Sequence, residues 1–157
     1  IGLKLSNELQ IGKAGEHLVC ADLIAQGYNA FLSDQGLPYD VVVDLNGRMI
    51  RVQVKTTTSL VSYAHAKDVY RFGTRRAKNS RAPVREKDVD YFAFVALDIR
   101  KIAYIPIKDM IARTGRVKQT VDFKTRRIKY VGRVYQNGTR RTPEWGRHLE
   151  DYSEFRV

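Results

Sequence analysis

Alternation of apolar and polar residues is clearest around Asn46-Gly47, where the sequence reads VVVDL before the pair and RMIRVQVK after it. An Asn-Gly pair between β-branched runs predicts a tight hairpin, because both residues adopt positive φ at little cost. A two-residue turn pairs Val43 with Ile50 and brings alternate, mostly apolar positions onto one face. We expect that face to be buried.

The opposite face of the predicted hairpin carries an acid, an amide and an amine. Asp40 falls opposite Gln53, and Lys55 lies two residues farther along on the same side. Cross-strand neighbours have Cβ atoms roughly 5 Å apart, so strand geometry alone brings these groups together. Such a face is ordinarily a solvated sheet surface. The alternative is a site for metal-assisted phosphodiester hydrolysis, because Mg²⁺ takes one or two protein carboxylates and an ammonium can orient water or steady a phosphate.

The rest of the pattern predicts one long helix followed by several strands. Apolar residues recur at helical spacing over 6–26, with Ser6 as the cap and Gly27 at the end. Small residues just before Glu16 favour close packing of this helix on the sheet, and they also leave room for a carboxylate to face a metal or phosphate. We further expect strands at 28–32 and 68–73, a hairpin at 90–107 whose first strand is covered on both faces, and a short helix at 110–113.

The composition is ordinary for a globular domain except in its charge. The 157 residues are enough for one domain with a real core, and 43% of them are hydrophobic. The 28 Lys and Arg outnumber the 17 Asp and Glu, and the formal net charge of +11 indicates a polyanionic partner, nucleic acid first. The basic stretches lack the amphipathic helical pattern of a membrane-binding surface. No apolar run is long enough to span a membrane, so we expect a cytoplasmic protein, and a single cysteine excludes an internal disulfide.

Two basic segments are candidates for DNA contact. One follows the strand at 68–73, and the other alternates with apolar residues over 116–134, which predicts a basic two-stranded ribbon turning near Thr125-Arg126. A solvated loop and a charged edge hairpin are the simpler explanations, but the large positive excess favours phosphate contact. The residues assigned to DNA binding are Arg71, Arg75, Arg76, Lys78, Arg81, Arg85, Lys118, Lys124, Arg126, Arg127 and Lys129.

Taken together, these residues resemble the signature of the PD-(D/E)XK nuclease superfamily. Pro38 and Asp40, followed by Gln53-Val54-Lys55, are similar to its Asp and (acid)-x-Lys on adjacent antiparallel strands, and Glu16 matches its helical acid. The resemblance covers residues from about 6 to 111 and is closest to small group I intron homing endonucleases and archaeal Holliday junction resolvases. Two departures stand out: one residue separates the Pro from the Asp, and Gln53 replaces the acid, which removes a charge.

The resemblance implies a single nuclease domain over 1–157, of the α/β (α+β) class, with a restriction-endonuclease-like mixed central sheet flanked by helices. Its core would span about 6–111, and 116–157 would add a basic β-hairpin and a tail. It also implies a Mg²⁺ site, which Mn²⁺ can occupy, formed by Asp40, Gln53, Glu16 and the backbone carbonyl of Val54. Lys55 would position or deprotonate the attacking water, and it joins Glu16, Asp40 and Gln53 as a predicted catalytic residue.

The expected function is site-specific hydrolysis of double-stranded DNA by a homing endonuclease. A Holliday junction resolvase and a catalytically inactive DNA-binding module are the alternatives. The basic ribbon favours the homing enzyme, because a site reader places side chains in the grooves, whereas the loss of the acid at Gln53 favours the inactive module. Cutting both strands requires two sites, so we expect a homodimer or tetramer. Trp145, Tyr152 and Phe155 should pack either on the domain itself or on another subunit, where they would form part of the interface.

Overall fold

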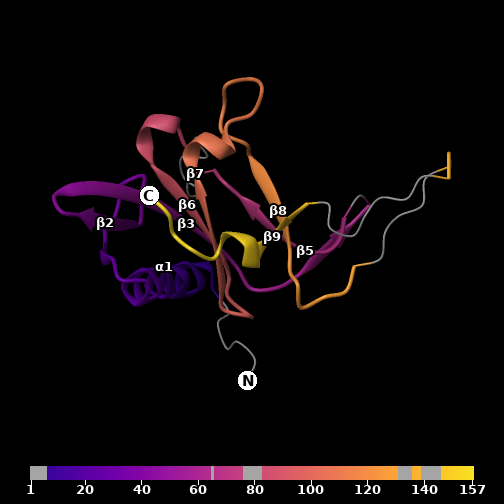
Figure 1. Ribbon diagram of the computed structural model, residues 1–157, viewed down its shortest axis with the longest axis horizontal. Coiled ribbons are helices and arrows are strands. Elements are labelled where there is room, and N and C mark those ends of the chain that lie inside the picture. The colour runs from indigo at the N-terminus through magenta and orange to yellow at the C-terminus, as the bar shows by residue number, and fades with distance from the viewer. Residues whose placement is uncertain (1–6, 65, 76–82, 131–135, 139–145) are drawn as a thin grey trace.

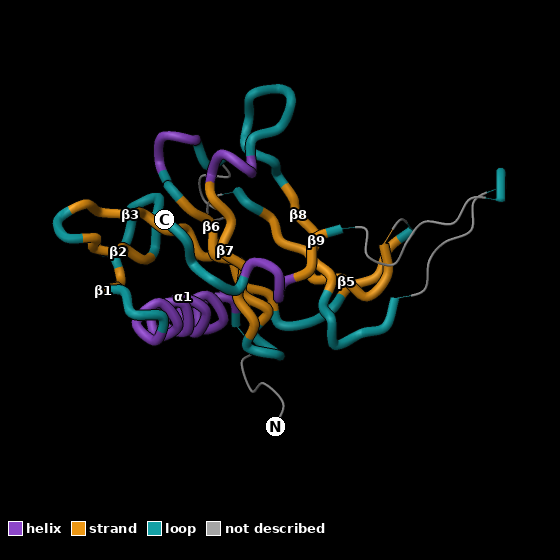
Figure 2. The backbone as a smooth tube through the Cα atoms, in the orientation of Figure 1, coloured by secondary structure: helices purple, strands orange, loops and turns teal. Residues whose placement is uncertain are grey.

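A five-stranded sheet lies at the centre of the computed structural model, which describes residues 7–64, 66–75, 83–130, 136–138 and 146–157. One face of this sheet packs against the helix α1, and the other packs against a smaller, four-stranded sheet (Figures 1 and 2). This is the mixed sheet with a flanking helix that the sequence predicted. Within the described residues, no helix is long and apolar enough to cross a membrane.

Helix α1 spans Glu8–Ala25, close to the predicted range. Its cap is Asn7, whose side-chain oxygen accepts a hydrogen bond from the Gln10 N–H at 2.8 Å, so the prediction of Ser6 as the cap is wrong. An Asn side chain reaches the third helical N–H from this position as well as a Ser does. Gly27, which follows the C-cap residue Gln26, terminates the helix as predicted, with a φ of +97°.

The central sheet has the strand order β1-β2-β3-β6-β7. Its strands are β1 Asn29–Leu32, β2 Val41–Leu45, β3 Arg48–Thr57, β6 Tyr91–Ala96 and β7 Lys101–Pro106. All neighbouring strands are antiparallel except β3 and β6, which are parallel. The predicted hairpin register is confirmed, since Val43 pairs with Ile50 and the turn residues Asn46 and Gly47 have φ of 52° and 96°.

The smaller sheet has the order β4-β5-β8-β9 and corrects one prediction. It contains β4 Val61–Tyr63, β5 Ala66–Gly73, β8 Thr120–Lys124 and β9 Arg147–His148. Strand β8 pairs with β5 and β9, and the described residues after its turn at 125–128 add no returning strand, so the self-contained ribbon over 116–134 is wrong. The reason is burial: pairing with β5 places Phe123 in the core with no exposure, which a projecting ribbon could not do.

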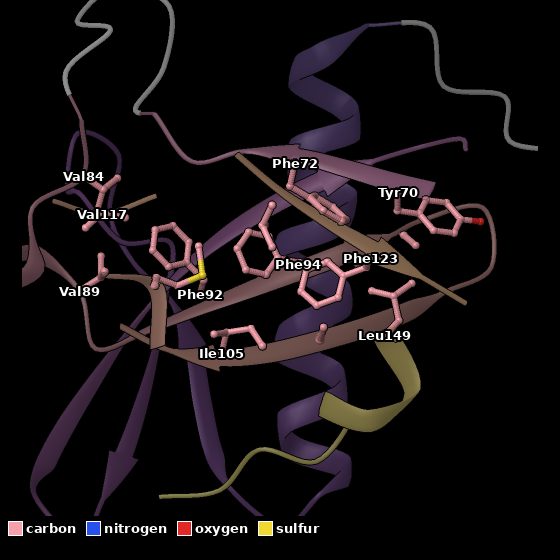
Figure 3. Packing of buried hydrophobic residues seen from close by; sticks show 14 residues of the cluster. Tyr70, Phe72, Val84, Val89, Phe92, Phe94, Ile105, Val117, Phe123 and Leu149 are labelled. Atoms are coloured by element: carbon pink, nitrogen blue, oxygen red, sulfur yellow. The ribbon is translucent and has the colours of Figure 1, made fainter. Parts of the chain in front are cut away.

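Two cores differ in chemistry on the two faces of the central sheet. Along β6, Phe92 and Phe94 point to the smaller sheet, whereas Ala93 and Val95 point to α1, which confirms a strand covered on both faces. The α1 side is largely aliphatic. The other side is aromatic, and Figure 3 shows Phe72, Phe94 and Phe123 packed together, with ring centroids 5.1 to 5.9 Å apart.

Three short 3-10 helices complete the described chain: η1 Glu86–Asp88, η2 Ile107–Met110 and η3 Leu149–Tyr152. The helix expected at 110–113 therefore lies one turn earlier, because Met110 is buried in the aromatic core and Ile111 forms a bridge with Val117.

The C-terminal tail packs on its own domain through Phe155, which is one of the two placements that the sequence predicted. Phe155 is buried among the rings of Tyr28, Tyr91 and Tyr104, at centroid distances of 4.7 to 5.5 Å. A side chain enclosed in this way cannot also contact a partner subunit. Trp145 lies outside the described residues.

Candidate active site

The β2–β3 hairpin fixes the carboxylate of Asp40. This residue immediately precedes β2, and its N–H donates to the carbonyl of Val52 at 2.9 Å, so it continues the ladder. Its Oδ2 accepts hydrogen bonds from Gln53 Nε2 at 2.9 Å and from the Val54 N–H at 2.8 Å. The predicted pairing of Asp40 with Gln53 is thus present in the structure, and a backbone donor holds the carboxylate in place.

The surroundings of Asp40 disfavour an uncompensated negative charge. Burial is the largest effect and raises the pKa of Asp40 to about 6, while the Val54 N–H lowers it. The nearby carboxylate of Glu16 raises the pKa further, and the ammonium groups of Lys55 and Lys13 lower it. Two carboxylates that repel each other in a partly desolvated place are a setting in which a bound cation is favourable.

Glu16 reaches this site because α1 lies unusually close to β3. Gly15 is buried, and a Cβ added there would lie 1.9 Å from Thr56 Oγ1, so only glycine permits this approach. The predicted groove of small residues is therefore confirmed at Gly15, whereas Gly12 faces open space. The side chain of Glu16 is only 17% exposed and pairs with Lys13 at 3.4 Å.

Lys55 lies at the junction of the two sheets. Its Nζ donates a hydrogen bond to the backbone carbonyl of Arg75, two residues beyond the end of β5, and the side chain is half-buried. The contact fixes the ammonium in direction. It also brings the start of the first basic segment to the site, a proximity that the sequence did not predict.

The residues present fit a divalent metal with few protein ligands. Asp40 and Glu16 supply two carboxylates, and Gln53 directs its amide nitrogen to Asp40, which leaves Oε1 as the atom able to coordinate. No group of three or more His, Cys, Asp or Glu side chains suited to a metal occurs in the described part of the chain. Mg²⁺ is compatible with this set, because it commonly keeps waters and takes one or two carboxylates together with substrate phosphates.

The predicted DNA-binding residues fall into four groups. Some form ion pairs within the chain: Arg71 with Asp122 at 3.6 Å, Arg85 with Asp88 at 3.2 Å and Arg126 with Asp151 at 2.8 Å. Others are exposed and pair with no carboxylate among the residues described: Arg75, Lys118, Arg127 and Lys129. Lys124 lies over the ring of Tyr130 at 5.0 Å. Arg76, Lys78 and Arg81 lie outside the described residues.

One residue near the site was missed from the sequence. Lys13 pairs with Glu16 and lowers the pKa of Asp40, so it belongs to the electrostatics of the site. Its spacing of three residues from Glu16 on a predicted helix is the signal that could have found it.

Residues 6–136 match the profile of the family described as PD-(D/E)XK endonuclease. No curated protein sequence is similar enough to the chain to count as a relative. Among solved structures, the bacterial homing endonuclease I-Ssp6803I superposes with a TM-score of 0.61 at 13% sequence identity, over 94% of this chain and 87% of that chain. The Holliday junction resolvase Hjc of Archaeoglobus fulgidus gives a TM-score of 0.43 at 18% identity, over 71% of this chain and 83% of that one. The first likeness shows that the fold is shared, and it is the restriction-endonuclease-like fold expected from the sequence.

Proposed function

The chain belongs to the PD-(D/E)XK endonuclease family of DNA nucleases, and we propose that it is a Mg²⁺-dependent homing endonuclease that cuts double-stranded DNA at a specific site. The likeness in fold to the homing endonuclease I-Ssp6803I supports the choice of a homing enzyme, since the basic ribbon was not found among the described residues. One observation carries the proposed hydrolysis. The Asp40 carboxylate is held by Gln53 and the Val54 N–H, beside Glu16 and next to the fixed ammonium of Lys55. These are the groups that metal-assisted phosphodiester hydrolysis requires, gathered at one place on the sheet.

In the proposed site, Asp40, Gln53, Glu16 and the Val54 carbonyl hold the metal, for which Mn²⁺ can substitute. When bound, the metal supplies Lewis-acid activation of the phosphate and of water. The backbone N–H of Val54 keeps Asp40 Oδ2 in place, so the carboxylate needs little rearrangement when it binds a cation. Lys13 balances the charge of Glu16 in the metal-free protein.

Lys55 acts on the attacking water. The Arg75 carbonyl accepts a hydrogen bond from Lys55 Nζ, which holds the ammonium in one direction near Asp40. A donor fixed in this way can orient water toward the phosphate or steady a non-bridging oxygen. This stabilisation requires no reorganisation at the moment of reaction.

The DNA would run past the end of β5. Arg75 and Lys118 lie at the adjoining ends of the β5–β8 pair, where Thr74 donates its N–H to the carbonyl of Gln119, and both are exposed. Arg127 and Lys129 follow the opposite end of β8 and are exposed there. We assign these four to phosphate contacts, and we propose a homodimer or larger assembly because two antiparallel strands must be cut.

Cleavage of a defined panel of DNA tests the proposal. The panel contains a duplex pool with a randomised central region and an immobile four-way junction, each incubated with Mg²⁺ or with chelator, and Lys55→Ala serves as the control protein. We expect Mg²⁺-dependent double-strand cuts in a subset of duplexes that share a sequence. Paired nicks confined to the junction would show a resolvase instead. Tight binding without any cut would show the inactive module, which the amide at Gln53 favours as the second candidate.

A further inference from the structure

The outer face of the smaller sheet carries a polar cluster that the hydrolytic chemistry does not use. Arg71 and Asp122 are direct register partners across β5 and β8, and Tyr63 ends the neighbouring strand β4. Arg71 Nε lies 3.6 Å from Asp122 Oδ1, and the Tyr63 hydroxyl donates to Asp122 Oδ2. The guanidinium carbon of Arg71 lies 4.3 Å from the centroid of the Tyr63 ring. We call these three residues the Arg71 triad.

The triad orients the guanidinium of Arg71 without enclosing it. The contact with Asp122 is made through Nε, and the ring of Tyr63 covers one face of the guanidinium plane. No other ion pair or hydrogen bond within the described chain involves this group, and the side chain is 43% exposed. The two terminal amino groups of Arg71, which form its hydrogen-bonding fork, therefore remain at the surface in a restricted orientation.

Asp122 holds Arg71 through its charge. Its Oδ1 is buried and has no hydrogen-bond partner among the described residues, and Arg71 is the one cation among them that forms an ion pair with it. A carboxylate placed in this way holds the arginine to one side of the strand pair. Arginine fixed by an acid behind it is suited to recognise a planar pair of acceptors in front of it.

We propose that Arg71 reads a guanine in the major groove of the target DNA, with Asp122 and Tyr63 as positioning residues. Around Arg71 and Asp122 only β5 and β8 pair with each other among the described strands, because β4 pairs with β5 no farther than Val69 and β9 pairs with β8 from Phe123 onward. The major groove admits such a pair of antiparallel strands, and an arginine fork donating to guanine O6 and N7 is the commonest specific contact there. The inference rests on the proposed function, because it names the base contact by which a site-specific nuclease selects its DNA. It assigns Arg71 to base reading, whereas the sequence placed it among phosphate contacts.

Gly73 supports a close approach of DNA to this face. It pairs with Thr120 beside the triad, its backbone needs no positive φ, and a Cβ added there would meet no atom within 4 Å. The chain's own packing thus gives no reason for glycine at this position. A glycine in a strand often marks a place where a ligand or another backbone comes near.

The triad is also close to the candidate active site. Arg71 and Arg75 are four residues apart, so their Cα atoms lie no more than about 14 Å from each other. The Arg75 carbonyl accepts the hydrogen bond from Lys55. The guanine read by Arg71 should therefore lie within about one helical turn of the cut phosphate.

The simpler explanation is an ordinary cross-strand ion pair, which would stabilise the sheet slightly and carry no sequence information. The experiment starts with the wild-type protein and a randomised duplex pool in Mg²⁺, from which the cleaved sequences give the target. Single-turnover kcat/KM is then measured on the target and on each single-base-pair variant. The proteins compared are wild type, Arg71→Ala, Arg71→Lys and Asp122→Asn, with Arg127→Ala as the matched exposed-arginine control.

We expect wild type to prefer guanine at one position by roughly 5- to 150-fold, the range of one bidentate base contact. Arg71→Ala and Arg71→Lys should reduce that preference to about onefold at this position alone, and Asp122→Asn should weaken it there. Arg127→Ala should slow cleavage of all sequences equally. An unchanged preference in both Arg71 variants, with melting temperatures near that of wild type, would overturn the inference and leave the nuclease proposal standing. Cleavage by wild type without any sequence preference would overturn both.

Discussion

The candidate active site and the Arg71 triad handle charge in opposite ways. At the active site, Asp40 is largely buried beside a second acid, and burial raises its pKa to about 6. In the triad, the guanidinium stays at the surface, balanced by one carboxylate and covered on one face by a tyrosine ring. The surroundings of Asp40 disfavour its negative charge until a cation binds. The second arrangement keeps the guanidinium charged and exposed at little energetic cost. The first suits binding of a metal for hydrolysis, and the second suits recognition of DNA.

The candidate active site and the Arg71 triad also differ in the contacts that fix their side chains. Asp40 is fixed by a backbone N–H in the interior of the hairpin, so its position depends on the sheet itself. Arg71 is fixed by side chains from two other strands, which can be changed one at a time. Substitutions at the first should change how fast DNA is cut, and substitutions at the second should change which DNA is cut.

The largest expected effect is the loss of chemistry with recognition kept. Asp40→Asn removes the charge that holds the metal, and Lys55→Ala removes the fixed ammonium; each should lower the rate of cleavage by about a thousandfold or more. Equilibrium binding to the target DNA should change little, as measured by gel-shift titration in Mg²⁺. Near wild-type turnover in either variant, with an unchanged melting curve, would show that the active site has been assigned wrongly.

Substitutions of Gln53 test whether its amide oxygen is a metal ligand or whether the side chain only lies beside Asp40. Gln53→Leu removes both the amide oxygen and the donor to Asp40 Oδ2, so cleavage should fall by about a hundredfold. Gln53→Glu supplies an oxygen with a charge and should retain measurable activity at saturating Mg²⁺, about half that of wild type or less. The measurement is the single-turnover rate against Mg²⁺ concentration. Equal activity of wild type and Gln53→Leu across that range would remove Gln53 from the site.

The raised pKa of Asp40 predicts a pH dependence of stability in the metal-free protein. The folded-state pKa of about 6 lies above the ordinary value of 3.8, so the folded state binds more protons between these values. Its stability should therefore fall as pH rises through about 4 to 6, and Asp40→Asn should not show this loss. With allowance for partial solvent access, the difference at pH 7 should be about 2 kcal/mol in favour of Asp40→Asn.

Urea unfolding in chelator from pH 4 to 8 measures that difference, with wild type and Asp40→Asn compared at each pH. Addition of Mg²⁺ should stabilise wild type at pH 7 and leave Asp40→Asn almost unchanged, since a ligand that binds the folded state adds to stability. Parallel curves for the two proteins over this pH range would show that Asp40 is not desolvated as described.

The candidate active site was largely predictable because its geometry is local. An Asn-Gly turn fixes the hairpin register, and the register places Asp40 beside Gln53. The small residues before Glu16 predicted close packing of α1 on the sheet, but only the family resemblance assigned Glu16 to the site, and only the fold identifies Thr56 as the residue that Gly15 approaches. Lys55 was expected on the right face, but its contact with the Arg75 carbonyl joins segments whose proximity only the fold reveals.

The triad was not predictable, for the same physical reason that the basic ribbon was placed wrongly. Alternation in β8 indicates a strand but does not identify its partner, and the partner β5 lies some fifty residues earlier. Without that pairing, Arg71 and Asp122 are two unrelated charges. The net positive charge of a sequence gives the excess of arginines and lysines over acids. It does not show which of these basic residues pair with a carboxylate in the folded chain.

The smallest expected effects test whether an arginine that is ion-paired in the free protein contacts DNA phosphate. Arg126 also pairs with an acid, but its terminal Nη2 lies 2.8 and 2.9 Å from the two carboxylate oxygens of Asp151, so the fork itself is occupied. Its backbone N–H also donates to Glu150, which makes it part of the fold. Arg126→Ala should cost about 1 kcal/mol of stability or less and leave the salt dependence of DNA binding unchanged.

Arg127→Ala, one residue away and exposed, should lower the slope of log K against log salt by about one and leave stability unchanged. If Arg126→Ala lowers that slope as much as Arg127→Ala does, the ion pair with Asp151 must open when DNA binds. Ion pairs in the free protein would then not distinguish arginines that stabilise the fold from arginines that contact DNA.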